Sequence, residues 1–196
     1  MEGPEKAKSI NGLVQVYTGP GKGKTTAALG LALRASGHNK KVCFIQFLKG
    51  GSYLGEIAAA RNVPGLKIRQ FGADCPWSEK LKSGELKCGS CRYCFSVLAE
   101  DKTNSKEAMD FAKESTASGE YDLVVLDEIN CAMAQQLIPV EDVLTLIKQK
   151  NKKTELVLTG RNAPKEILDA ADLVTEMKML KHPMYKGVDS RLGIEF

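Results

Sequence analysis

The sequence of 196 residues has no strong charge surplus, no long apolar run and no apolar segment at its start. Its 28 basic and 24 acidic residues give a net charge of +4, which is too small a surplus to predict binding to nucleic acid or to a membrane surface. No run approaches the roughly 18 apolar residues of a membrane-spanning helix. Because residues 1–9 are polar and lack the apolar core of a secretory signal, we expect a cytoplasmic protein.

Internal repeats are also lacking, as is any linker that would separate two hydrophobic cores. The length is enough for one domain with a full core, and the hydrophobic fraction of 43% is ordinary for a globular protein. We therefore expect a flexible lead over residues 1–11 and a single domain over residues 12–196. In a reducing compartment the six cysteines are not expected to form disulfides.

The central motif is a glycine-rich stretch between a predicted strand, residues 13–18, and a predicted helix, residues 24–36. Strand, glycine-rich turn, Gly-Lys-Thr and helix is the order that a phosphate-binding loop (P-loop) requires, although the usual spacing has a glycine where this chain has Thr18. Backbone N–H groups and the helix N-terminus would face an anion, Lys24 would reach the outer phosphates, and the Thr25 hydroxyl would bind Mg²⁺. The alternative is a Gly/Lys-rich surface turn. The expected phosphate-binding residues are Thr18, Gly19, Gly21, Lys22, Gly23, Lys24, Thr25 and Thr26.

Short apolar runs alternate with helical patterns along the rest of the chain. Strands are predicted at residues 42–47, 66–71, 123–126, 155–159 and 173–177, and helices at 56–61, 105–118, 139–153 and 164–170. Nearly continuous apolar strands are typical of a parallel sheet that is covered on both faces. The sequence therefore predicts a three-layer α/β domain, of the P-loop NTPase (recombinase-like) class, with a mainly parallel sheet.

Polar residues follow two of these strands directly. Asp127 and Glu128 end one strand, and Arg161 follows another in a Thr-Gly-Arg sequence. Because ligands bind beyond the carboxyl ends of strands in an open α/β sheet, we expect both groups to lie beside the P-loop. The two acids would then bind or orient Mg²⁺, and Arg161 would neutralise phosphate charge. The alternatives are surface acids and a solvated arginine in a turn.

Residues 72–104 lack periodicity and form a predicted Cys-rich insertion or lid. Its four cysteines include a Cys-x2-Cys-x2-Cys run, and thiolates at this spacing suit Zn²⁺ or an iron–sulfur cluster. Free thiols in a mobile loop are the alternative. Trp77, in the same segment, would cover a flat ligand or anchor the loop. The predicted metal-binding cysteines are Cys75, Cys88, Cys91 and Cys94.

From residue 12 to the end, the chain resembles the P-loop ATP:corrinoid adenosyltransferases. The resemblance rests on the P-loop, including its Thr18, and on several linked motifs that occur in the same order. These are Gln46-Phe47-Leu48-Lys49-Gly50, Asp127-Glu128-Ile129-Asn130, Leu158-Thr159-Gly160-Arg161, Ala171-Asp172-Leu173-Val174-Thr175-Glu176, Lys181-His182 and Gly193-Ile194-Glu195.

The resemblance implies transfer of the 5′-deoxyadenosyl group of ATP to the Co(I) centre of a corrinoid, with release of triphosphate, in adenosylcobalamin biosynthesis or salvage. Members bind ATP in the P-loop in the reverse sense from kinases, which leaves C5′ accessible. Since Co(I) is already a strong nucleophile, the protein must orient C5′ and stabilise the leaving triphosphate. The residues implied to carry this chemistry are Lys24, Thr25, Glu128 and Arg161, with Asp127 supporting Thr25 and Glu128 at Mg²⁺ or Mn²⁺.

The resemblance further implies a homodimer and an electron-donating, flavodoxin-like reductase as partner. Members hold the corrinoid under a Phe-x-Trp pair, of which Trp77 matches the second position while Cys75 stands at the first. Two other functions are considered for the chain. One is a thymidine-kinase-like phosphotransferase with a four-cysteine metal lasso, and the other is a P-loop ATPase that acts as a regulatory switch.

Overall fold

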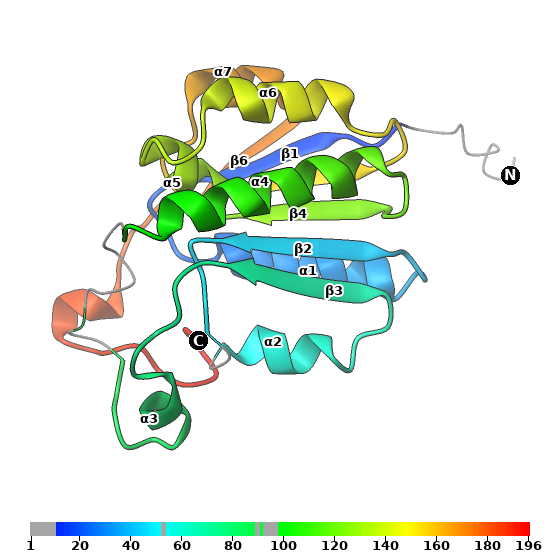
Figure 1. Ribbon diagram of the computed structural model, residues 1–196. Helices are drawn as coiled ribbons and strands as arrows, with labels where there is room; N and C mark the ends of the chain where they lie inside the picture. Colours follow the sequence, from blue (N-terminus) through cyan, green and yellow to red (C-terminus); the bar gives the residue numbers. More distant parts are fainter. Residues whose placement is uncertain (1–10, 52–53, 89–90, 92–97) are drawn as a thin grey trace, which may run out of the picture.

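The computed structural model describes residues 11–51, 54–88, 91 and 98–196, and its centre is a six-stranded sheet (Figure 1). The strand order is β3-β2-β4-β5-β1-β6, and every pairing is parallel. The strands are β1 (Val14–Thr18), β2 (Val42–Phe47), β3 (Leu66–Phe71), β4 (Leu123–Asp127), β5 (Glu155–Thr159) and β6 (Leu173–Glu176).

Helices cover both faces of this sheet, as the apolar strands predict. On one face, α1 packs Ala28 and Ala32 against strand residues that include Phe44 and Val125. The opposite face contacts α4, α5, α6 and α7 through a larger cluster that includes Ile45. The helices are α1 (Lys24–Ser36), α2 (Gly55–Ala60), α3 (Ser78–Lys82), α4 (Asp101–Ala117), α5 (Ile129–Ala134), α6 (Val140–Gln149) and α7 (Lys165–Ala170), with a 3₁₀ helix η2 (Pro183–Lys186). The predicted three-layer α/β class is confirmed.

The sequence patterns miss three short elements and misplace two helix boundaries. The short helices α3, α5 and η2 were not expected. Helix α4 begins at Asp101, four residues before the predicted start, and α6 ends at Gln149, four residues before the predicted end at residue 153. Each of the three contains at most six residues, and a segment of that length carries only a weak periodic pattern.

The predicted lead and insertion are covered only in part. Residues 1–10 of the lead lie outside the described residues, as do residues 89–90 and 92–97 of the insertion. Within the described ranges, no helix combines the length and the apolar character needed to cross a bilayer.

Candidate active site at the carboxyl edge of the sheet

The loop after β1 needs glycine for two physical reasons. Gly19 and Gly23 have φ values of 95° and 114°, a region that glycine adopts without the steric cost of a Cβ atom. At Gly21 the backbone N–H donates to the carbonyl of Met177 at 2.7 Å, and a Cβ atom there would lie only 2.6 Å from that oxygen. The loop is thus held against the chain that follows β6, and α1 begins directly after it at Lys24.

Lys24 points back into this loop. Its Nζ donates to the carbonyl oxygens of Gly19 at 2.8 Å and Gly21 at 2.7 Å. Burial lowers the pKa of Lys24, although the neighbouring carboxylate of Glu128 acts against that shift. The ammonium group therefore lies inside the loop, with two neutral oxygens as its partners.

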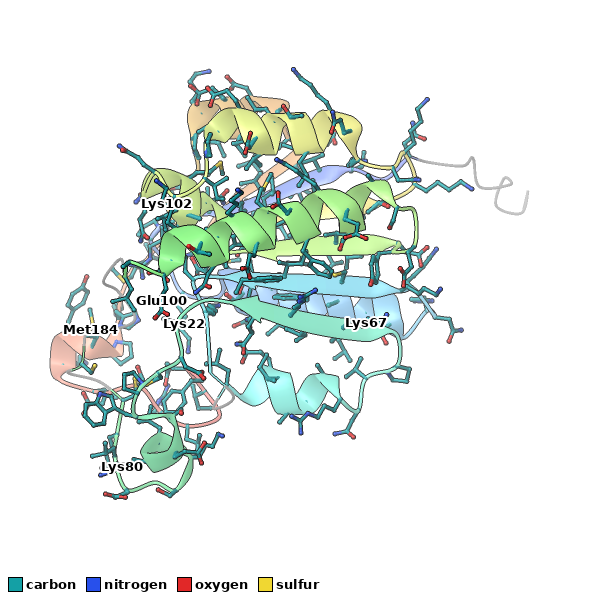
Figure 2. The ribbon with its side chains drawn as sticks, viewed as in Figure 1. Lys22, Lys67, Lys80, Glu100, Lys102 and Met184 are labelled. Atoms are coloured by element: carbon teal, nitrogen blue, oxygen red, sulfur yellow. The ribbon has the colours of Figure 1, made fainter. Side chains whose placement is uncertain are left out.

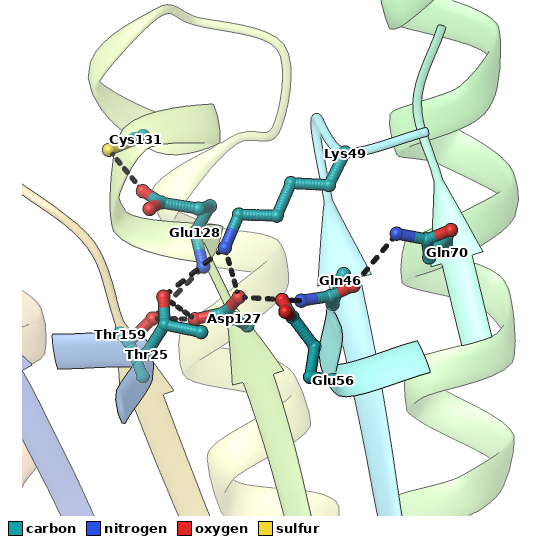
Figure 3. A network of polar contacts seen from close by, with 9 residues as sticks. All are labelled: Thr25, Gln46, Lys49, Glu56, Gln70, Asp127, Glu128, Cys131 and Thr159. Atoms are coloured by element: carbon teal, nitrogen blue, oxygen red, sulfur yellow. Dashed lines mark hydrogen bonds and ion pairs between the residues drawn. The ribbon is translucent and has the colours of Figure 1, made fainter. Parts of the chain in front are cut away.

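Asp127, at the end of β4, is the centre of the polar network in Figure 3. The residue is fully buried, so its carboxylate needs hydrogen-bond donors. Its Oδ1 accepts from the hydroxyls of Thr25 at 2.9 Å and Thr159 at 2.6 Å. Its Oδ2 accepts from Lys49 Nζ at 2.7 Å and from Gln46 Nε2 at 3.3 Å. The ends of β2, β4 and β5 and the start of α1 meet at this one side chain.

Lys49 is the cation of this network. Its Nζ contacts the Thr25 hydroxyl at 3.2 Å as well as the Asp127 carboxylate. Burial acts to lower the pKa of Lys49, but the nearby carboxylates of Asp127 and Glu128 outweigh it, and the net pKa is raised. The preceding Leu48 has a φ of 57°, an uncommon conformation for a bulky residue.

Two glutamines extend the network across the sheet. Gln46 is fully buried on β2 and lies opposite Asp127 in the β2–β4 register. Its Nε2 also donates to Glu56 at 3.1 Å, and its Oε1 accepts from Gln70 of β3 at 3.0 Å (Figure 3). Neither Gln46 nor Lys49 was expected from the sequence to belong to the site. The available signal was a glutamine inside an otherwise apolar strand.

Glu128 follows Asp127 but is oriented differently. Its φ of 64° is left-handed, and its Oε2 accepts from the thiol of Cys131 at 2.8 Å (Figure 3). Burial and the Glu128 carboxylate raise the pKa of the Cys131 thiol to about 12. The same sulfur accepts the backbone N–H of Arg161 at 3.2 Å. Cys131 therefore connects Glu128 to the loop after β5.

A cavity of about 460 Å³ is lined by the P-loop, the loop after β5, α7 and β6. The exposed Arg161 lies on its wall, and so does Thr18, whose hydroxyl accepts the N–H of Ala163 at 3.3 Å. The lining residues are Thr18, Gly19, Pro20, Arg161, Asn162, Ala163, Leu168, Val174 and Glu176.

Lys22 of the P-loop, labelled in Figure 2, contacts the C-terminal segment. Its Nζ donates to Glu195 Oε1 at 2.7 Å and to the carbonyl of Ile194 at 3.2 Å. Hydrogen bonds from Arg191 and Lys22 lower the pKa of Glu195 to about 2. Thr26, the last predicted loop residue, is exposed on α1.

Residues 72–88 of the insertion extend from the carboxyl edge of the sheet toward the C-terminal segment (Figure 1). Trp77 precedes α3 and is 48% exposed. Cys75 is buried, while Cys94 lies outside the described residues, so the four-cysteine cluster is not seen as a whole. Within the described ranges, no three side chains of His, Cys, Asp or Glu are grouped to hold a metal ion.

Comparisons with known proteins point to one family. The family model described as ATP:corrinoid adenosyltransferase BtuR/CobO/CobP matches residues 10–196. The corrinoid adenosyltransferase of Escherichia coli K12 is 32% identical over 194 residues, which cover 97% of this chain and 89% of that protein. The corrinoid adenosyltransferase of a Sinorhizobium species is 34% identical over 189 residues, or 94% and 80% of the two chains.

One solved structure is similar to this chain in its fold only. The flagellar accessory protein FlaH of Methanocaldococcus jannaschii superimposes with a TM-score of 0.52 at 14% identity, over 85% of this chain and 72% of that chain.

Proposed function

This chain belongs to the ATP:corrinoid adenosyltransferase family, and on that premise we propose that it transfers the 5′-deoxyadenosyl group of ATP to the Co(I) centre of a corrinoid. The C5′–O bond of ATP breaks, a cobalt–carbon bond forms with the electron pair of Co(I), and triphosphate leaves. The observation that carries the proposal is the meeting of the P-loop, Lys24 and the Thr25–Asp127 pair at one edge of the sheet.

The P-loop and Lys24 would hold the triphosphate. The loop amides and the N-terminus of α1 present positive partial charge to an anion. The two carbonyl oxygens now bonded to Lys24 Nζ stand where phosphate oxygens would compete for the same ammonium group. Binding the leaving group in this way lowers the barrier, because negative charge on the bridging oxygen grows as the C5′–O bond breaks.

Mg²⁺ fits the donors beside the loop. Thr25 Oγ1 and Asp127 Oδ1 are 2.9 Å apart, and one ammonium group already contacts both side chains. Oxygen donors that leave room for phosphate oxygens are the set that Mg²⁺ prefers. Thr25 and Glu128 would hold the ion and Asp127 would orient them; when bound, the ion neutralises triphosphate charge.

Arg161 would add charge to the leaving group from the loop after β5. Its backbone is held by Cys131, while its exposed side chain on the wall of the cavity stays available for an anion. An arginine in this position acts by matching its planar donors to phosphate oxygens.

The insertion would hold the corrinoid, with Trp77 covering its flat ring. Cys75, Cys88, Cys91 and Cys94 would bind zinc or an iron–sulfur cluster that fixes this segment in place. Metal analysis and the absorption spectrum of anaerobically purified protein distinguish the two, because zinc gives no visible colour. We further propose a cytoplasmic homodimer that receives electrons from a flavodoxin-like reductase; sedimentation and reduction assays test both points.

The function is tested by mixing the protein with ATP, Mg²⁺ and reduced corrinoid. The expected products are a light-sensitive adenosylated corrinoid and triphosphate in equal amounts, and a Lys24→Met variant should lose this activity. Lys152→Met, which alters an exposed lysine in the turn before β5, is the matched control. Formation of ADP and orthophosphate without adenosylated corrinoid would overturn the proposal and favour a phosphotransferase or an ATPase.

A further inference from the structure

The contacts of Lys49 suggest a role in metal binding that its place in the sequence does not suggest. Its ammonium group lies 2.7 Å from Asp127 Oδ2 and 3.2 Å from Thr25 Oγ1. These two side chains belong to the proposed metal site, so a positive charge of the protein itself already occupies the neighbourhood in which a cation would bind. We propose that Lys49 is a built-in counter-cation that keeps divalent metal out of the nucleotide-free site and makes metal binding conditional on ATP. This inference rests on the proposed function.

The backbone around Lys49 is held by the neighbouring chain, which fixes the point from which its side chain reaches Asp127. Leu48 donates its N–H to the Phe71 carbonyl at 3.1 Å. A Cβ atom added at Gly72 would lie 2.4 Å from the N atom of Lys49, so the two chain segments touch along their backbones. The start of the insertion therefore supports the segment that carries Lys49.

The tip of the Lys49 side chain can still leave the network. The side chain is 25% exposed, whereas Asp127 is fully buried, and four rotatable bonds separate its ammonium group from the backbone. Asp127 would retain hydrogen bonds from Thr25, Thr159 and Gln46 after Lys49 moves. A phosphate group entering the P-loop offers the ammonium group a second anion, which is absent without ATP.

The charge balance explains why metal and nucleotide would bind together. A divalent ion near Thr25 and Asp127 would face the Lys49 ammonium group at short range, where like charges repel strongly in a partly buried site. Triphosphate carries enough negative charge to satisfy both cations. By thermodynamic linkage, ATP should then raise the affinity for metal by the same factor as metal raises the affinity for ATP.

The experiment measures Mn²⁺ binding to the full chain by the electron paramagnetic resonance signal of free Mn²⁺, with and without ATP. Without ATP, Lys49→Met should bind Mn²⁺ at least ~10-fold more tightly than the unmodified protein, because the repulsion is gone while the Asp127 carboxylate remains. Lys49→Gln, which keeps a hydrogen-bond donor without the charge, should behave in the same way and provides a second variant if the first does not fold. Lys49→Arg should exclude Mn²⁺ as the unmodified protein does.

Lys40→Met is the matched control. This variant removes a lysine at the opposite edge of the sheet, where Lys40 Nζ lies 2.9 Å from an Asp122 oxygen. The distance is similar to that of the Lys49–Asp127 pair, and Mn²⁺ binding should be unchanged. Equal Mn²⁺ affinities of Lys49→Gln and the unmodified protein without ATP would overturn the inference. A failure of the proposed function looks different: Mn²⁺ would bind with ATP, yet no adenosylated corrinoid would form.

Discussion

The ion pair between Lys49 and Asp127 gives a quantitative prediction for stability. In Asp127→Asn the Thr25 and Thr159 hydroxyls can still donate to the amide oxygen, but the amide nitrogen faces two donors, Lys49 Nζ and Gln46 Nε2. Removing one partner of a buried pair costs about 3–5 kcal/mol. We expect about 3 kcal/mol, the lower end of that range, because the Lys49 side chain is 25% exposed and can turn toward water.

The assays are urea denaturation and thermal unfolding, both in the presence of a metal chelator and without nucleotide. For a chain of this size a loss of about 3 kcal/mol corresponds to a fall in Tm of roughly 10 °C. The double variant Asp127→Asn/Lys49→Met should lose less than the sum of the two single variants, with a coupling of about 2 kcal/mol.

A second cycle on an exposed ion pair is the control. Lys40 and Asp122 lie 2.9 Å apart with side chains 55% and 42% exposed, so their coupling should stay below about 1 kcal/mol. If the losses of the Lys49 and Asp127 variants add to within about 0.5 kcal/mol, the ion pair contributes no net stability and the reasoning is refuted.

Three further predictions concern the loop, its contact with the C-terminal segment and the site cysteine. Gly21→Ala should weaken binding of an ATP analogue at least ~10-fold, because the added Cβ atom would lie 2.6 Å from the Met177 carbonyl oxygen. The control is Gly30→Ala on α1, where an added Cβ atom meets no such neighbour within 4 Å and ATP-analogue binding should be normal. Equal affinities of the two variants would contradict this prediction. The pKa of Glu195, about 2, lies below its ordinary value of 4.5. The contacts of its carboxylate therefore contribute their full stability above pH 4.5, and this contribution is lost as the pH falls toward 2. Glu195→Gln should lower Tm at pH 7 but not at pH 2, and an equal effect at both pH values would refute the assignment. With a thiol pKa of about 12, Cys131 should be only ~10⁻⁴ thiolate at pH 8 and resist iodoacetamide, while Glu128→Gln should speed its alkylation, as mass spectrometry would detect.

The sequence predicted those features of the fold and the site that depend on residues close together along the chain. The P-loop and the six strands follow from local patterns, because glycine spacing and continuous apolar runs act over a few residues. The positions of Asp127 and Arg161 at the carboxyl edge follow from the same patterns, since a parallel sheet brings its strand ends together.

The partners of Asp127 could not be predicted in this way. Gln46 meets Asp127 through the β2–β4 register, and that register depends on packing across the whole sheet rather than on either strand alone. Cys131 reaches Glu128 because Glu128 has a left-handed φ of 64°, a conformation that no propensity assigns to glutamate. Contacts between residues far apart in sequence therefore determine which side chains bond to one another in the network. Local sequence patterns determine only at which edge of the sheet the network lies.

The lysines of the site share one arrangement. Lys24 is bonded to carbonyl oxygens of its own loop, Lys49 to Asp127, and Lys22 to Glu195 and the Ile194 carbonyl. Each ammonium group is thus held by protein oxygens, and the network around Asp127 is largely shielded from water before any ligand enters. Triphosphate binding would exchange these oxygens for phosphate oxygens. Little of the cost of ordering the three cations, and of desolvating Lys24 and Lys49, would then remain to be met during the reaction. Such an arrangement suits a leaving group with many negative charges better than a single phosphate, because one phosphate cannot replace the partners of all the cations at once.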